Sequence, residues 1–307
     1  MMRIDRVALR NRVRPIAQWA AALSLLIMLS ACQHTPLVTG TGEFLYADRY
    51  VPLRPLNVYY HLPEAYNEDS PIVFVMHGMN RNAAAYREPW IPLADAYGFV
   101  LVLPEFSKEF YPGSALYNLG NAAGPVGVPR PVARWDFSQI ERLFDEVKRR
   151  TGNKTSRYYI YGHSAGGQFV HRMVLLLPSA RIQHAVAANA GWYTMPTFDT
   201  GWPYGLRRAP ATRDKLRKAF ETRMTILLGD RDTNPEDPQL NQLPRAVAQG
   251  PHRFARGHTF YETAQQEAEA LDTTLNWDLR EVPGVGHSNG GMAPAAADAF
   301  FGPEVLR

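Results

Sequence analysis

A serine, an aspartate and a histidine each follow a strand-like apolar run of this chain, in an order that suits nucleophilic catalysis. Ser164 lies in the pentapeptide Gly-His-Ser-Ala-Gly at 162–166, between a β-type run at 157–161 and a helix-compatible run at 168–175. Glycine-x-serine-x-glycine between a strand and a helix is typical of a sharp turn that exposes a serine at a helix N-terminus. Side chains in place of its glycines would collide with the neighbouring strand or helix. We therefore predict that Ser164 is a nucleophile, although such a pentapeptide alone also arises by chance.

A serine hydroxyl needs a histidine base, and the base needs a carboxylate to fix its tautomer. The apolar run at 224–228 ends in a polar turn that holds Asp230 and Asp232, and the alternating run at 277–282 ends in a glycine-rich loop with His287. Acids just past a strand's carboxyl end are where a sheet enzyme builds its site. We predict His287 as the base and Asp232 as its acid, because the turn must carry the acid away from the strand. Asp230 is the alternative acid, and an ordinary Asp-rich turn is the structural alternative.

A third apolar run, at 71–76, is followed by His77, Gly78 and Met79. The glycine permits backbone to approach a substrate oxygen closely. We predict that an oxyanion is bound by the backbone N–H groups of Met79 and of Ala165, the residue after the nucleophile. His77 precedes the glycine, so we expect it to order the loop by hydrogen bonding rather than to act as a base.

Together these motifs resemble the α/β-hydrolase superfamily over about residues 55–300, and within it the secreted esterases of the poly(3-hydroxyalkanoate) depolymerase and feruloyl esterase type. The resemblance rests on His77-Gly78, on the pentapeptide, on the turn with Asp232 and on Gly286-His287. It implies hydrolysis of a small-molecule or polymeric carboxylic ester through an acyl-enzyme. The motifs are specific for the superfamily and weak for the substrate. Those esterases usually carry disulfides, whereas this chain has a single cysteine.

Two other functions remain open from the sequence. Peptidase or thioesterase chemistry on the same fold would use the same catalytic parts. A non-catalytic, lipid-anchored binding protein belongs to a different class, and a full set of catalytic parts argues against it, though fold alone does not establish function.

Residues 1–31 have the composition of a secretory signal peptide. Five arginines and one aspartate lie before or near the start of an apolar run at 19–29 that is too short for a stable transmembrane span. The run ends in Leu-Ser-Ala-Cys, which resembles the lipobox of bacterial lipoproteins. The resemblance implies lipidation of Cys32 and membrane anchoring in the bacterial cell envelope, with a buried free thiol as the structural alternative. An aspartate after the cysteine would resemble an inner-membrane retention signal, and since Gln33 stands there, the resemblance implies the outer membrane.

The signal segment also accounts for the basic charge of the chain. The sequence has 33 basic and 29 acidic residues, and five arginines and one aspartate of these lie in 1–31. The remainder therefore has 28 of each, a balance of zero. This gives no support to nucleic-acid binding, and we expect no nucleic-acid partner.

The rest of the chain predicts a tether at 32–53 and one catalytic domain at 54–307, with a first strand near 56–60. Apolar runs alternate with helical stretches, which favours a mostly parallel α/β sheet covered by helices on both faces. The helices predicted on this pattern, apart from the one after Ser164, span 83–97, 137–150, 259–271 and 292–301.

Three loops are predicted to shape the pocket. The loop at 106–134 is long, and the loop at 192–212 carries Trp192, Tyr193 and Trp202, which we predict to bind an acyl or aryl group, with a small satellite core as the alternative. Histidines and arginines gather at 250–258, where they can meet an acidic group or a lipid headgroup. A solvated or salt-bridged loop is the favoured interpretation there. No CxxC, HExxH, calcium-loop or P-loop pattern is present, so we expect neither a metal nor a cofactor.

Overall fold

The structure is a computed structural model that describes residues 35–124 and 127–303. The predicted signal peptide and Cys32 lie outside the described residues. From Leu37 onward the chain forms one compact unit. In the described ranges, no helix combines the length and the apolar character that crossing a membrane requires.

A single sheet of eight strands runs through this unit in the order β1-β2-β4-β3-β5-β6-β7-β8. The first two strands lie antiparallel to their neighbours, and the strands from β4 to β8 are parallel to one another. Strands buried on both faces are expected to be continuous apolar runs, and the residues of β3 are all buried. The strands are β1 (Gly40–Tyr46), β2 (Leu56–Leu62), β3 (Ile72–Met76), β4 (Val100–Glu105), β5 (Tyr158–His163), β6 (Ile182–Ala188), β7 (Met224–Gly229) and β8 (Trp277–Val282).

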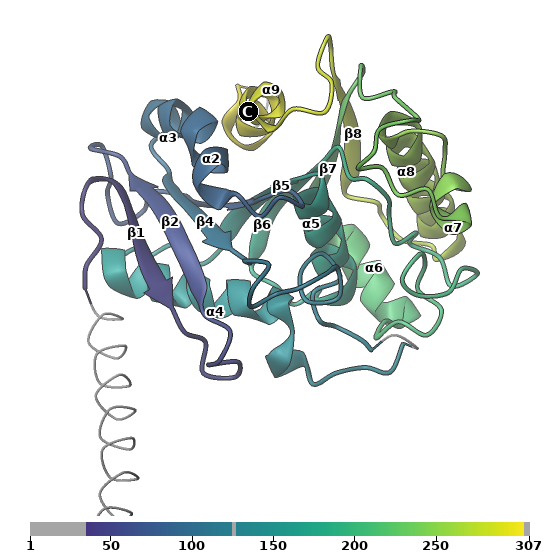
Figure 1. The fold of residues 1–307 in the computed structure, drawn as a ribbon, viewed down its shortest axis with the longest axis horizontal. Helices are drawn as coiled ribbons and strands as arrows, with labels where there is room; N and C mark the ends of the chain where they lie inside the picture. Colours follow the sequence, from purple (N-terminus) through teal and green to yellow (C-terminus); the bar gives the residue numbers. More distant parts are fainter. Residues whose placement is uncertain (1–34, 125–126, 304–307) are drawn as a thin grey trace, which may run out of the picture. The chain divides into compact units, whose positions relative to one another are not determined.

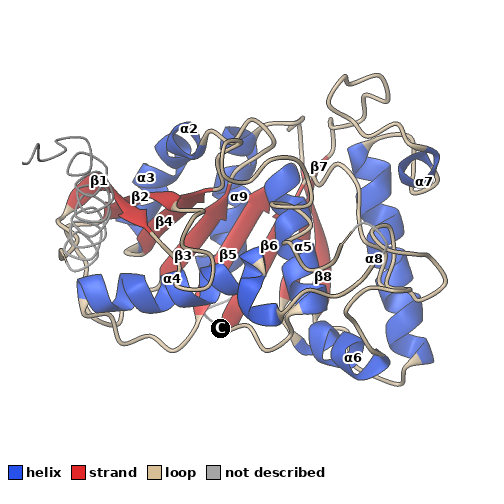
Figure 2. Ribbon diagram, turned by 60° about the horizontal axis from the view of Figure 1, so that its bottom comes forward, coloured by secondary structure: helices blue, strands red, loops and turns tan. Residues whose placement is uncertain are grey.

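Helices cover both faces of the sheet (Figures 1 and 2). One face packs against α4, α5, α6 and α8, and the other against α2, α3 and α9. This is the doubly covered, mostly parallel α/β fold that the sequence predicts. The helices are α2 (Ala83–Arg87), α3 (Ile91–Tyr97), α4 (Asp136–Thr151), α5 (Ala165–Leu176), α6 (Arg213–Glu221), α7 (Pro244–Val247), α8 (Arg253–Ala270) and α9 (Asn289–Phe301), with 3₁₀ turns at Glu88–Trp90 and Val132–Arg134.

Two sequence predictions about local structure need correction. Part of the predicted tether, Gly40–Tyr46, is strand β1, which pairs along its whole length with β2. Its glycines and polar residues hide the strand signal, because an edge strand needs only one buried face. Helix α8 begins at Arg253, six residues before the predicted start, and so takes in most of the stretch predicted as a loop. The side chain of His252 caps its N-terminus by accepting from the Ala255 N–H at 3.2 Å.

The turn between β5 and α5 owes its shape to its glycines. Ser164 has φ +59° and ψ −117°, a strained conformation for a residue with a side chain. A Cβ on Gly162 would lie 2.2 Å from the carbonyl oxygen of Gly166, and a Cβ on Gly166 would lie 2.0 Å from that of Met76 in β3. The collisions that the sequence predicts are therefore present. The N-terminus of α5 can approach the sheet this closely only because the side chains are missing.

Candidate active site

Ser164, His287 and Asp232 form one line of hydrogen bonds at the carboxyl ends of the parallel strands. His287 Nε2 lies 3.0 Å from Ser164 Oγ, and its Nδ1 lies 2.7 Å from Asp232 Oδ2. Ser164 follows β5, Asp232 lies in the turn after β7, and His287 lies in the loop between β8 and α9. Strand ends of a parallel sheet meet at one edge, which brings together residues up to 123 positions apart.

The two aspartates after β7 have different partners. Asp230 accepts from the Gly284 N–H at 2.7 Å and so supports the turn after β8, whereas Asp232 contacts His287. Asp232 is buried, and its second oxygen lies 3.3 Å from Arg253 Nη1. The geometry thus separates a structural acid from one that orients the histidine.

Arg253 is a residue whose part in this site the sequence did not reveal. Its guanidinium is buried and contacts Asp232 and, at 2.8 Å, Asp237 Oδ2. Hydrogen bonding to Arg253 holds the pKa of Asp237 below its ordinary value. The charge pattern at 250–258 was visible in the sequence, but its partner lies 21 residues upstream. The favoured interpretation of residues 250–258 was a solvated or salt-bridged loop. Arg253 is indeed salt-bridged, but it lies on helix α8 rather than in a loop.

The segment His77–Asn80, here called the oxyanion loop after its predicted role, lies beside Ser164. Met79 and Ala165 both line the cavity that contains Ser164. As the first residue of α5, Ala165 has an N–H group without a partner inside its own helix. The prediction that these two backbone groups face a substrate oxygen stays a prediction, and their shared position at the cavity is consistent with it.

His77 orders this loop, as the sequence suggests. Its Nδ1 lies 2.9 Å from the Gly78 carbonyl oxygen, and its Nε2 accepts from the Phe106 N–H at 3.0 Å. The ring also stacks on Tyr117, with centroids 4.6 Å apart. Burial lowers the pKa of His77 to about 3, so the ring is neutral at neutral pH. It therefore acts as a structural crosslink between two strand-end loops.

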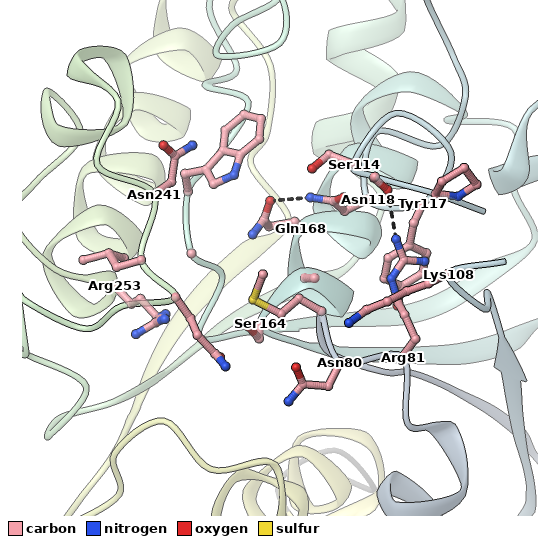
Figure 3. A pocket seen from close by; sticks show the side chains of 18 residues that line it. Asn80, Arg81, Lys108, Ser114, Tyr117, Asn118, Ser164, Gln168, Asn241 and Arg253 are labelled. Atoms are coloured by element: carbon pink, nitrogen blue, oxygen red, sulfur yellow. Dashed lines mark hydrogen bonds between the residues drawn. The ribbon is translucent and has the colours of Figure 1, made fainter. Parts of the chain in front are cut away.

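A cavity of about 520 Å³ opens beside Ser164. Figure 3 shows Arg253 on one side of the serine and Arg81 and Lys108 on the other. The 18 residues that line it include these three cations and several amides, but no aspartate or glutamate. The Arg81 guanidinium donates to the carbonyl oxygens of Phe106 and Gly113, which carry no net charge. The cavity lining is therefore polar. Arg81 and Lys108 contribute positive charge to it, whereas the charge of Arg253 is balanced by its ion pairs with Asp232 and Asp237. The aromatic residues of the loops did not predict this charge.

The three aromatic residues predicted to bind substrate separate in the structure. Trp192 lines the cavity, with the Arg172 guanidinium 4.0 Å from its ring centroid. Tyr193 is fully buried and stacks on Phe260, and Trp202 packs into the main core. The prediction is therefore wrong for Tyr193 and Trp202, because packing turns these side chains away from the cavity. The satellite core weighed as the alternative exists around Trp192 itself.

Two buried arginines lie behind the cavity wall. Arg172 donates to Thr194 and to carbonyl oxygens of helix α5 and the 106–134 loop, and Arg256 donates to the carbonyl oxygens of Gly191 and Gly250. Burial lowers the pKa of Arg172 to about 9 and that of Arg256 to about 10. Both remain protonated at neutral pH, so they add to the positive charge around the substrate cavity.

Among known proteins, solved structures match this chain, whereas no protein-family model does. The solved structure of poly(aspartic acid) hydrolase-1 from Sphingomonas sp. KT-1 matches with 44% identity and a TM-score of 0.81, over 85% of this chain and 98% of that one. LpqC, a poly(3-hydroxybutyrate) depolymerase from Bordetella parapertussis, matches with 38% identity and a TM-score of 0.82, over 86% of this chain and 90% of that one.

The chain belongs to the α/β-hydrolase family of serine hydrolases. It is an enzyme of the carboxylic ester hydrolase class, as the sequence predicts. An S-formylglutathione hydrolase from Agrobacterium tumefaciens shares the fold at 18% identity and a TM-score of 0.56. Among curated proteins, a bifunctional acetylxylan esterase/xylanase from Neocallimastix patriciarum is 24% identical over 136 residues. That match spans 44% of this chain and 17% of the fungal protein.

The contrast between the two aspartates yields a prediction. We expect Asp232→Asn to lower kcat by about 10⁴-fold, because an amide cannot hold His287 in the tautomer that accepts the serine proton. Asp230→Asn should stay within about threefold of the wild type, because an amide oxygen still accepts from the Gly284 N–H. Steady-state ester hydrolysis measures both variants. A larger loss in Asp230→Asn than in Asp232→Asn would contradict the assignment.

Proposed function

We propose that this protein is a serine esterase that cleaves carboxylic esters through Ser164, His287 and Asp232. The single observation that carries the proposal is the unbroken line of hydrogen bonds from Asp232 through His287 to Ser164, with distances of 2.7 and 3.0 Å. These lengths fall within the reach that proton transfer between a nucleophile and its base requires.

In the proposed reaction, His287 removes the hydroxyl proton of Ser164 as Ser164 Oγ attacks the ester carbonyl. Negative charge then develops on the carbonyl oxygen, where the backbone N–H groups of Met79 and Ala165 are proposed to donate. His287 gives its proton to the leaving alcohol, and the acyl group stays on the serine. Water activated by the same histidine releases the acid, while Asp232 stabilises the imidazolium in both steps.

Hydrolysis of p-nitrophenyl esters with acyl chains of two to sixteen carbons tests this proposal. We expect the full-length protein to turn over at least part of the series, and Ser164→Ala to lose about 10⁶-fold in kcat, because the nucleophile is missing. Labelling by a fluorophosphonate serves as an independent readout. Full activity of Ser164→Ala would contradict the mechanism, and the absence of both turnover and labelling would favour a non-catalytic binding protein.

A second candidate substrate is an anionic polymer cleaved at amide or ester bonds. Its support is the pair of cations Arg81 and Lys108 in a cavity whose lining contains no carboxylate, together with 44% identity to a poly(aspartic acid) hydrolase. Positive charge in a partly enclosed cleft attracts anionic substrates and speeds their association. This candidate corresponds to the peptidase alternative of the sequence analysis, with its substrate restricted to polyanions.

Lys108 tests the anionic-substrate candidate. Lys108→Gln is expected to raise KM for the mono-p-nitrophenyl ester of succinate by about two- to fivefold, while leaving hydrolysis of the neutral butyrate ester unchanged. The difference in KM between Lys108→Gln and the wild type should shrink at high salt, because dissolved ions screen the attraction between the exposed Lys108 and the succinate carboxylate. Lys148→Gln, on the surface of α4, is the matched control. Equal effects of Lys108→Gln on both esters would contradict the candidate, and release of fragments from poly(aspartic acid) would test the polymer itself.

We also propose that the enzyme is anchored in the bacterial cell envelope, at the outer membrane, through a lipid on Cys32. The support is the sequence alone: a basic segment, a short apolar run and Leu-Ser-Ala before the cysteine. Stable attachment through lipids takes two membrane signals, and we propose that the lipid on Cys32 supplies them.

Cys32→Ser tests the anchor. We expect the variant to incorporate no labelled palmitate and to leave the membrane fraction, because no acyl chain attaches to serine in this position, while wild-type protein is labelled and sediments with outer membranes. The hydrolysis rate of the isolated variant controls for folding. Equal palmitate incorporation by both proteins would contradict the proposal.

A further inference from the structure

Tyr86 is a partly buried polar residue that the proposed mechanism does not use. It lies on the short helix α2 and packs against the apolar core on that face of the sheet. Its hydroxyl lies directly against the oxyanion loop, since a Cβ on Gly78 would be only 2.6 Å from Tyr86 Oη. Burial raises the pKa of Tyr86 to about 12, so the hydroxyl is protonated at neutral pH.

The same hydroxyl contacts His163, the residue before the nucleophile. Tyr86 Oη lies 3.1 Å from His163 Nδ1. Burial keeps the pKa of His163 well below its ordinary value, and the nearby His287 lowers it further, so the ring is neutral. Either tautomer of the neutral ring can form this hydrogen bond, because the Tyr86 hydroxyl can both donate and accept.

His163 in turn lies against the catalytic base. Its ring centroid is 4.6 Å from that of His287, with 37° between the ring planes. Because the His163 ring is fixed at this distance, it limits how far the His287 ring can tilt. Because it is neutral, it places no second charge beside the His287 imidazolium. Tyr86 thus touches, through one hydroxyl, both the loop next to the substrate oxygen and the ring that packs on the base.

We propose that Tyr86 is a positioning residue that fixes the oxyanion loop and the His163–His287 ring pair relative to Ser164. The inference rests on the proposed serine-hydrolase mechanism. Negative charge on the substrate oxygen and positive charge on His287 develop together in the transition state, and preorganised groups stabilise them without rearranging. A loose loop or a tilted base raises the barrier, because a misplacement of about 1 Å can reduce the rate about 100-fold.

Tyr86→Phe in the full chain tests this inference by removing only the hydroxyl. We expect kcat for a p-nitrophenyl ester to fall by about 10- to 100-fold, with KM within about twofold, because the ground-state ester does not depend on the oxyanion contacts. The second-order rate of fluorophosphonate labelling should fall by a similar factor, because it also builds charge on an oxygen attacked by Ser164 Oγ. Tyr159→Phe is the matched control, since Tyr159 packs on the same apolar core far from the oxyanion loop.

A double-substitution cycle with His163→Leu separates positioning from a loss of structure. If Tyr86 acts partly through His163, the double variant is expected to label no more slowly than the slower single variant, because residues that act as a unit are non-additive. If the losses in labelling rate of the two single variants are fully additive in the double variant, the inference that Tyr86 acts on His287 through His163 is wrong. Labelling of Tyr86→Phe within about twofold of wild type would overturn the proposal, as would a rise in KM equal to the fall in kcat.

The two readouts also separate this inference from the proposed esterase function. If the wild type reacts with the fluorophosphonate but hydrolyses no ester, the substrate assignment is wrong, and the labelling rates still decide the role of Tyr86. If esters are hydrolysed and Tyr86→Phe matches the wild type in both readouts, the esterase function stands and the positioning role is wrong.

Discussion

The strained backbone of Ser164 fixes the point around which the proposed catalytic groups are arranged. A φ of +59° is held by a turn in which α5 approaches the carbonyl oxygens of β3 more closely than any side chain would allow. The strain has a direct chemical effect, because it places Oγ at the start of α5, where unpaired N–H groups and the helix dipole favour negative charge. The base, the acid and the oxyanion loop must all be arranged around this fixed point.

Buried ion pairs hold in place the groups that surround Ser164. One carboxylate oxygen of Asp232 contacts Arg253, and the other contacts His287. Arg253 therefore balances the charge of Asp232 and also lines the cavity beside Ser164. Arg253 also holds Asp237, which belongs to the segment that supplies Gln239 and Asn241 to the cavity wall. Breaking a buried pair of this kind leaves an unpaired charge, which costs about 3–5 kcal/mol. The wall of the cavity and the orientation of the base therefore depend on the same ion pair.

The sequence predicts the fold and the line of hydrogen-bonding groups because both depend on local patterns. Apolar runs locate the parallel strands, and Ser164, Asp232 and His287 follow strand ends, where parallel topology alone brings them to one edge. The loop aromatics behave differently: Tyr193 and Trp202 resemble Trp192 in sequence, and only packing against residues such as Phe260 decides which of them faces the cavity. The three cations that line the cavity come from three separate segments, so no local pattern reveals that they lie together.

The charge of the cavity has a consequence for the end of the reaction cycle. Hydrolysis of a neutral ester yields an acid that is ionised at neutral pH, whatever the alcohol was. That anion forms at Ser164, in a cavity to which Arg81 and Lys108 contribute positive charge. These two cations favour the anionic product over a neutral ester. The acid occupies the same cavity as the substrate, so accumulated acid is expected to act as a competitive inhibitor.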